Sequence, residues 1–438
     1  MVIAVYCLER RIQMKFEATL HKLSNGITVI LDPMDVATDE FSVCFHTGGN
    51  DETPAEYGLT HFCEHMFCAG TPRFPTQRRA NDYMADHGGS VNARTGLSRI
   101  EFVGRIVARN LNVLIDFTAD RLQNSLFDEK VIDNERGVII EELRRSLSRE
   151  NTRMRIFCDK NLFNLYVPNG KVVLGTPETI NSFTRDQMRE FIARRMSAHN
   201  CLICVSGKIE NQDELLKTLE EKFSFLPTHD VSVNQELTYT ACRAHNLMPD
   251  RKNVVLEILF PEKWPDTDEN LFQNLCVGKF SNCLRQKLFD VLRSENGLTY
   301  GVNMTGYGNM WTSVCGPRIE TDVENIERVV ALTAQTSYKV YSENLPNDTD
   351  LLRYKNQNEL GRANFLESNA DRCDRMVTDW LIYKNMYDFN KQTKISDSIT
   401  NADVIKYTRN YFDGPMSIIT HGPKCDGDLE QIWHDNFK

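Results

Sequence analysis

The sequence predicts an α+β protein made of two similar domains, each a mostly antiparallel sheet layered with helices. The first half of the chain interleaves strand-like segments with helical segments, which is typical of such layered domains. After a polar stretch at 227–251 the same order begins again, with an apolar strand at 254–260 and a long helical region at 269–292. This return indicates an internal duplication of about 200 residues. The predicted division of the 438 residues is therefore a first domain at 1–226, a linker at 227–251 and a second domain at 252–438.

Local signals place the elements of the first domain. Asn25-Gly26 is a tight-turn dipeptide between strand-like segments at 18–23 and 27–31, so we expect a hairpin there. Residues 90–95 are expected to lead into a following strand. Further strands are predicted at 41–45, 98–106 and 201–207, and helices at 110–123, 129–148 and 213–223.

The chemistry of the chain is concentrated in the pentapeptide His61-Phe62-Cys63-Glu64-His65. Residues three and four apart share one face of a helix, so His61, Glu64 and His65 would point the same way. Two neutral imidazoles at this spacing can hold one zinc ion, and the carboxylate between them can lie beside a water molecule without being a ligand. The order His-x-x-Glu-His is that of the inverzincins. The alternative is an ordinary helix with two partly buried histidines and a solvated glutamate.

A catalytic zinc ion usually takes three protein ligands, so this site needs a third. The predicted helix at 129–148 supplies candidates. Glu135 and Glu142 are two turns apart on one face of that helix, whereas Glu141 is rotated away from them by about 100°. The residues alone do not favour any of these carboxylates as the ligand.

Several segments in this order resemble the insulinase/pitrilysin family of zinc peptidases. They are the pentapeptide, the following Met66-Phe67-Cys68-Ala69-Gly70-Thr71, the stretch Gly89-Ser90-Val91-Asn92-Ala93-Arg94-Thr95 and the glutamate-bearing helix. The resemblance implies that Glu142 is the third zinc ligand, with Glu135 as a second acidic residue that supports the site. It also implies that Glu64 is the catalytic base. Asn92 and Ala93 would lie on an exposed strand edge that binds substrate backbone by strand addition, where the sequence alone shows a glycine turn.

The second half carries no intact His-x-x-Glu-His, so the resemblance assigns it no zinc. Its segment Leu292-Arg293-Ser294-Glu295-Asn296-Gly297-Leu298-Thr299-Tyr300 is similar to the arginine and tyrosine motif of the family. By that match Arg293 and Tyr300 serve a zinc centre, in their own chain or a partner chain, where the arginine holds the substrate and the phenol donates to the developing oxyanion. Without the match, Arg293 would be a surface charge and Tyr300 a strand aromatic. The glycine-rich loop of the family is reduced here to Gly278.

The resemblance covers nearly the whole chain and implies a zinc-dependent endopeptidase that hydrolyses unfolded peptides in an enclosed chamber, with Zn2+ as cofactor. In this family two halves enclose the chamber, and this chain, which resembles the subunits of mitochondrial processing peptidases, supplies one. We expect a homodimer, with a heterodimer containing a zinc-less relative as the alternative. The alternative function is a non-hydrolytic peptide-binding subunit of a processing complex.

Composition and charge limit the classes of partner and the cellular compartment that we expect. Hydrophobic residues at 41% and charged residues at 26% are ordinary for a globular protein, and the net charge of −10 disfavours nucleic acid and anionic membranes as partners. Thirteen scattered cysteines do not form a disulfide framework and favour a reducing compartment.

The apolar residues at 1–8 precede the charged residues that follow them, which is the wrong order for a secretory signal, and Met14 could equally be the start. No apolar run reaches the roughly 18 residues of a membrane span. We expect a cytoplasmic protein, with the mitochondrial matrix or a related organelle as the alternative.

Overall fold

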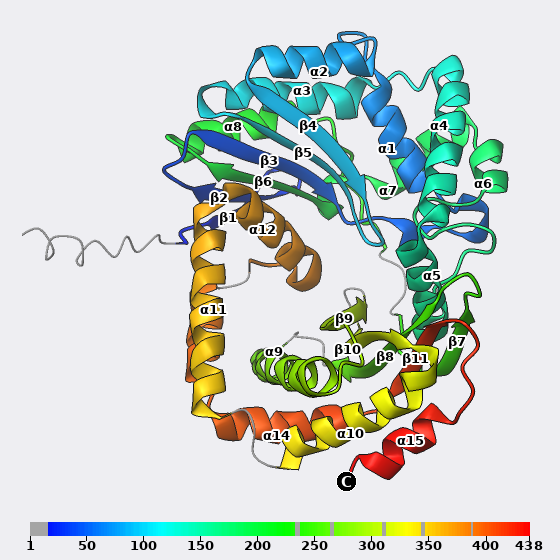
Figure 1. Ribbon diagram of the computed structural model, residues 1–438. Helices are drawn as coiled ribbons and strands as arrows, with labels where there is room; N and C mark the ends of the chain where they lie inside the picture. Colours follow the sequence, from blue (N-terminus) through cyan, green and yellow to red (C-terminus); the bar gives the residue numbers. More distant parts are fainter. Residues whose placement is uncertain (1–15, 233–236, 263–266, 309–311, 343–346, 387–388) are drawn as a thin grey trace, which may run out of the picture.

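The computed structural model describes residues 16–232, 237–262, 267–308, 312–342, 347–386 and 389–438 (Figure 1). Its helices and strands form two sheets, each layered with helices, and the sheets lie one above the other in the view of Figure 1. The predicted α+β class is therefore confirmed. None of the helices in these ranges combines the length and the apolar character needed to cross a lipid bilayer.

The first sheet has six strands in the order β1-β2-β6-β3-β5-β4. The pair β2 and β6 is parallel and the other neighbours are antiparallel. The hairpin predicted around Asn25-Gly26 is confirmed, because Lys22 pairs with Thr28 across that turn. The strands are β1 (Thr19–Lys22), β2 (Thr28–Pro33), β3 (Thr38–Phe45), β4 (Gly89–Thr95), β5 (Ile100–Val107) and β6 (Cys201–Gly207). Residues 90–95, which local signals placed before a strand and the resemblance placed on an exposed strand edge, belong to β4, which forms one edge of the sheet.

Alternation along the strands of the first sheet produces two apolar faces. In β2, Val29 and Leu31 face a core filled by helices of the first half, while Ile30 between them faces the opposite side. Each of these side chains is fully buried, so both faces must be covered. The helices of the first half are α1 (Leu59–Ala69), α2 (Gln77–Asp86), α3 (Leu111–Asn124), α4 (Glu129–Ser148), α5 (Glu150–Phe163), α6 (Pro177–Ser182), α7 (Arg185–Arg195) and α8 (Gln212–Lys222).

The second sheet has five strands in the order β7-β11-β8-β10-β9. They are β7 (Arg243–Leu247), β8 (Asn253–Glu262), β9 (Val302–Gly308), β10 (Ser313–Asp322) and β11 (Ser417–Gly422). The prediction of a linker throughout 227–251 is wrong at its end, because 243–247 forms β7 and pairs in parallel with β11. This strand has no fully buried side chain, so it lacks the apolar alternation by which strands are recognised in a sequence.

Helices of the second half build a core against that sheet. Helix α9 (Asp268–Phe289) runs into a π-helical turn at Asp290–Glu295, which places the predicted helical region at 269–292 inside one continuous helical segment. The others are α10 (Ile326–Ser342), α11 (Asp348–Glu367), α12 (Asn369–Tyr383), α13 (Phe389–Ser398), α14 (Asn401–Phe412) and α15 (Leu429–Asn436). The core includes Phe260 of β8 and Phe280 of α9, both buried.

Two helices cross from one half of the chain to the sheet of the other. Helix α12, from the second half, packs under the first sheet on Ile30 and Cys204, with Trp380 and Met376 buried in the contact (Figure 1). Helix α5, from the first half, packs its Cys158, Leu162 and Phe163 on the second sheet. The two main cores lie within the predicted segments, one built from residues 23–226 and the other from residues 254–433, but each sheet is also covered on its other face by a helix from the other segment.

A buried ion pair fixes α12 to the first sheet. Arg372 donates to both carboxylate oxygens of Asp32, with the Nε to Oδ2 distance at 2.7 Å. Ser206 donates to the same carboxylate at 2.6 Å. The Arg372 and Asp32 side chains are 1% and 0% exposed. A bidentate pair of this kind defines one orientation of the helix on the sheet.

Candidate metal centre

The first turn of α1 is held by its neighbours. Gly58 has a φ of +91°, and a side chain there would meet the carbonyl oxygen of Leu174 at 2.6 Å, so glycine is required. The carboxylate of Glu52 accepts from the backbone N–H groups of Gly58 at 2.8 Å and Thr60 at 2.7 Å. These bonds satisfy backbone donors that have no partner within the helix. The start of α1, and with it His61, is thereby fixed in place.

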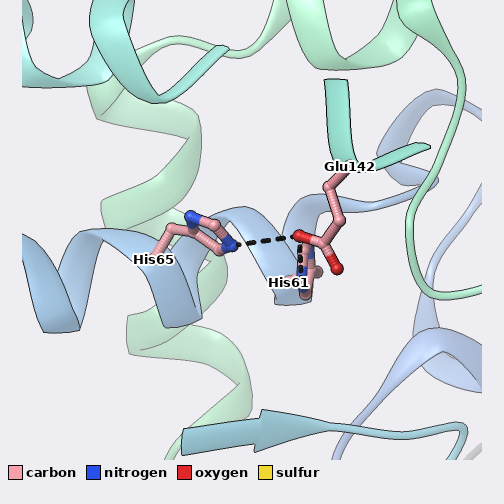
Figure 2. A group of neighbouring side chains, drawn as sticks. All are labelled: His61, His65 and Glu142. Carbon is pink, nitrogen blue, oxygen red and sulfur yellow. Dashed lines mark ion pairs between the residues drawn. The ribbon is translucent and has the colours of Figure 1, made fainter. Parts of the chain in front are cut away.

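Three donor atoms converge where α1 meets α4 (Figure 2). Glu142 Oε2 lies 3.7 Å from His61 Nε2 and 3.6 Å from His65 Nε2. Zinc bonds of about 2.0–2.2 Å to nitrogen and oxygen put neighbouring tetrahedral ligands roughly 3.3–3.5 Å apart. Two imidazole nitrogens and one carboxylate oxygen at this spacing fit a zinc ion with a fourth position left open.

The glutamate side chains of α4 point in different directions. Glu135 Oε2 lies 2.8 Å from His65 Nδ1, so it holds the ring nitrogen that faces away from Glu142. The side chain of Glu141 is 73% exposed and pairs with Arg144 at 3.6 Å. The structure thus brings Glu142 and Glu135 to the histidines and turns Glu141 to solvent.

The pKa values of the two histidines are shifted in opposite directions. Burial lowers the pKa of His61 to about 4, with the neighbouring His65 adding to the effect. Burial also acts to lower the pKa of His65, but hydrogen bonds to Glu135 and Glu142 outweigh it and raise that pKa to about 9. Without a metal, the His65 imidazole is therefore protonated at neutral pH, and its positive charge lies between the Glu135 and Glu142 carboxylates. A metal cation bound between these groups would supply that charge instead.

Glu64 lies on the same face of α1, beside the three donor atoms. Burial raises its pKa, and the charges of His65 and Glu142 act on it. Thr95, the last residue of β4, donates its hydroxyl to the Glu64 carboxylate. A base with a raised pKa is better matched to proton transfer near neutral pH. Thr95 lies in a stretch that the sequence singled out, but no sequence signal assigned it a role.

The remaining predicted site residues lie in two other places. Asn92 and Ala93 sit on β4, which pairs only with β5 among the described strands and leaves its other edge open. Arg293 places its guanidinium 5.2 Å from the centre of the Tyr300 ring, and Tyr300 is 89% exposed. Among the described residues, neither makes a hydrogen bond or ion pair with the histidines, Glu64 or Glu142. Their predicted action on a substrate stays a prediction.

Known proteins share the sequence pattern of the chain. The profile described as insulinase (Peptidase family M16) matches residues 32–164, and the profile described as peptidase M16 inactive domain matches residues 182–358. An uncharacterized zinc protease of Rickettsia bellii is 27% identical over 429 residues, covering 94% of this chain and 98% of that protein. The probable mitochondrial-processing peptidase subunit beta of Arabidopsis thaliana is 27% identical over 258 residues, covering 58% of this chain and 48% of that protein.

Solved structures share the fold. The first half of the periplasmic protease PqqL from Escherichia coli superposes with a TM-score of 0.80 at 17% identity, covering 96% of this chain and 97% of that one. A peptidase M16 inactive domain from Pseudomonas fluorescens superposes with a TM-score of 0.80 at 15% identity, covering 94% and 100%. The resemblance read from the motifs is thus confirmed, and the chain is a half-length member of peptidase family M16, the insulinase family.

Proposed function

We propose that this chain is a zinc-dependent endopeptidase. The observation that carries the proposal is the convergence of His61, His65 and Glu142, with Glu64 beside them and Glu135 behind His65. Relatives named zinc proteases support it. Three nitrogen and oxygen donors with an open fourth position are typical of catalytic zinc, whereas structural zinc takes four protein ligands.

Each residue of the centre has one task in this proposal. A bound zinc ion would supply a Lewis acid that acidifies water and polarises the scissile carbonyl. Glu64 takes the proton of the attacking water and delivers it to the leaving amine, for which a carboxylate with a raised pKa is suited. Glu135 accepts from His65 Nδ1 and keeps Nε2 directed at the metal position. Thr95 orients the Glu64 carboxylate.

The open edge of β4 is the proposed binding site for the substrate backbone. This strand ends at Thr95, which touches Glu64, so a peptide paired along Asn92 and Ala93 would lead to the metal centre. Strand addition requires an extended peptide, which favours unfolded substrates. We also propose that two chains enclose the substrate in a chamber, as a homodimer, and that Arg293 and Tyr300 contact the substrate there. A protein that remains monomeric in light scattering at working concentration would contradict the enclosed chamber.

The test is hydrolysis of a mixed pool of unstructured peptides by the purified protein, by Glu64→Gln and by the control Glu141→Gln. We expect chelator-sensitive cleavage, restored by zinc, in the parent and the control. Glu64→Gln should bind zinc but cleave nothing. Normal turnover by Glu64→Gln would refute the assigned base. Bound zinc without cleavage in the parent protein would instead favour a non-hydrolytic peptide-binding subunit.

A further inference from the structure

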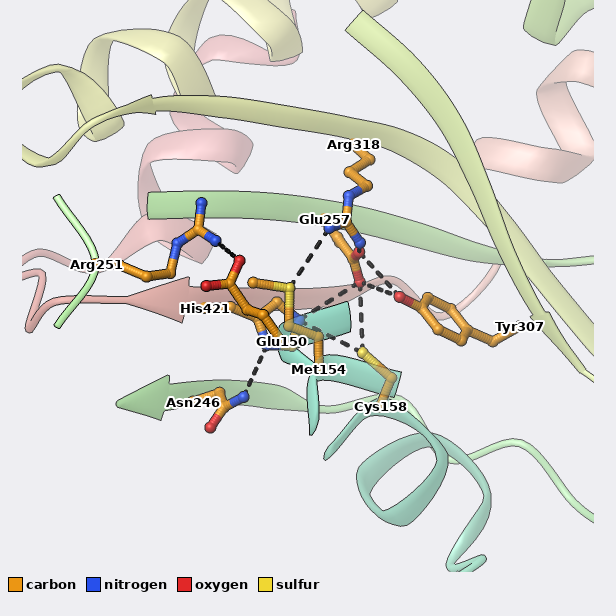
Figure 3. Close-up of polar contacts among 9 residues, drawn as sticks. All are labelled: Glu150, Met154, Cys158, Asn246, Arg251, Glu257, Tyr307, Arg318 and His421. Carbon is orange, nitrogen blue, oxygen red and sulfur yellow. Dashed lines mark hydrogen bonds and ion pairs between the residues drawn. The ribbon is translucent and has the colours of Figure 1, made fainter. Parts of the chain in front are cut away.

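A second group of metal-ligating side chains shares no residue with the first. It consists of Cys158 on α5, Glu257 on β8 and His421 on β11 (Figure 3). All three are 0% exposed. We propose that these residues form a second metal site, for zinc or a similar divalent transition metal, that pins α5 of the first half to the second sheet.

The spacing of the three donor atoms matches that of a tetrahedral zinc site. Cys158 Sγ lies 3.4 Å from Glu257 Oε2 and 3.5 Å from His421 Nε2, and the last two atoms are 3.7 Å apart. Zinc bonds of about 2.3 Å to sulfur and about 2.0–2.2 Å to nitrogen and oxygen give tetrahedral edges of roughly 3.3–3.6 Å. The edges at the first metal centre, 3.6 and 3.7 Å, are of the same size.

The second ring nitrogen of His421 has a polar partner, as metal-bound histidines usually do. Asn246 contacts His421 Nδ1 at 3.0 Å, in the position that Glu135 takes toward His65 Nδ1. A half-turn of the Asn246 amide presents its carbonyl oxygen to Nδ1–H and leaves the Nε2 lone pair free for a metal.

The two carboxylate oxygens of Glu257 face different partners. Arg318 donates to Oε1 at 2.6 Å, while Oε2 faces the thiol and the imidazole. Tyr307 donates its hydroxyl at 2.9 Å from both oxygens and also lies within reach of Cys158, so it is the nearest further donor for a fourth position.

Charge permits a cation here. When the metal binds, the Cys158 thiol loses its proton to solvent and a metal–sulfur bond forms, with no change in oxidation state. The thiolate and the Glu257 carboxylate then balance a divalent ion, with His421 neutral. Arg318 keeps its own charge, but its side chain is 27% exposed, so water screens it.

Burial decides between a structural and a catalytic role. Cys158 contacts His421, and His421 contacts Asn246, which is the order of a nucleophile, a base and an orienting amide. However, none of the three ligands has exposed surface, and burial and Glu257 raise the pKa of the thiol. A thiol kept protonated and out of reach of substrate does not act as a nucleophile. With Tyr307 as the fourth protein ligand, a closed site that joins elements of both halves is suited to holding structure.

Cobalt substitution tests the proposal on the full chain, because only a thiolate ligand gives Co2+ an intense near-ultraviolet charge-transfer band, and the first metal centre has no sulfur ligand. We expect this band in the parent protein and in His61→Ala, and its loss in Cys158→Ser. Cys276→Ser, which changes a buried cysteine on α9, is the matched control and should keep the band. Absence of the band in the cobalt-loaded parent, or its persistence in Cys158→Ser, would overturn the proposal.

Metal content and stability give independent measurements. We expect two zinc ions per chain in the parent and one in either His61→Ala or Cys158→Ser. In His61→Ala, added zinc should raise the midpoint of thermal unfolding, because a metal that binds only the folded state stabilises it. The same addition should have no effect in the double variant His61→Ala, Cys158→Ser. A single zinc, lost in His61→Ala and kept in Cys158→Ser, would refute the second site while leaving the proposed peptidase intact.

Discussion

Replacing Glu135 with glutamine is expected to weaken zinc binding by about 10- to 100-fold. Glu135 Oε2 lies 2.8 Å from His65 Nδ1, and both side chains are largely buried, at 23% and 20% exposed. A charge-assisted hydrogen bond in such a place contributes about 1.5–3 kcal/mol, and about 1.4 kcal/mol corresponds to a factor of ten in affinity. Glutamine keeps the shape but removes the charge, so the effect isolates the electrostatic support of the ligand.

Competition against a chromophoric chelator at fixed pH measures this change. Glu141→Gln is the matched control, because it lies on the same helix with a 73% exposed side chain. Its zinc affinity should equal that of the parent. Thermal unfolding of the metal-free proteins checks that both variants fold. Equal zinc affinity in Glu135→Gln and Glu141→Gln would refute the role of Glu135 in orienting His65.

Three further predictions concern pH, stability and metal. Thr95→Val removes a hydroxyl that stabilises the Glu64 carboxylate, so the pKa of Glu64 rises and the acidic limb of the kcat/KM profile moves to higher pH; an unmoved limb would contradict this. Arg372→Met leaves Asp32 buried without its partner and should lower the free energy of unfolding by about 3–5 kcal/mol in denaturant titrations, against about 0–1 kcal/mol for the exposed Arg144→Met. Zinc at 100 times its Kd should stabilise the metal-free protein by about 2.7 kcal/mol for each site it fills, measured in calorimetry, and no shift of the midpoint would argue against a folded-state site.

Local signals predicted the elements that carry their own pattern. The strand at 201–207 and the helix at 129–148 have the predicted bounds, because the first is a continuous buried run and the second begins at an N-cap, Asp128, whose side chain accepts from two backbone N–H groups. The shared direction of His61, Glu64 and His65 follows from helical spacing alone. Periodicity also turned Glu141 away from Glu135 and Glu142, but choosing Glu142 as the ligand needed the family resemblance.

Contacts between distant segments could not be predicted in this way. Strand β7 depends on pairing with β11, about 170 residues later, and has no apolar pattern of its own. Cys158 and His421 are separated by 263 residues, and nothing in either neighbourhood resembles a ligand motif. Such groups exist only once the sheet and the helix of the other half have come together. For the same reason the sequence did not predict that α5 packs on the second sheet and α12 on the first.

The exchange of α5 and α12 determines how the chain can be cut. A fragment ending near residue 226 would contain the ligands of the first metal centre but would lack α12, so Ile30, Cys44 and Leu202 would be exposed to water on one face of a six-stranded sheet. Exposed apolar sheet faces of this kind associate with one another, and the fragment should be recovered as insoluble aggregate. Supplied together, the two fragments could restore each other by complementation. The proposed peptidase activity thus requires both halves of the chain, although the ligands of the first metal centre, His61, His65 and Glu142, all lie in its first third.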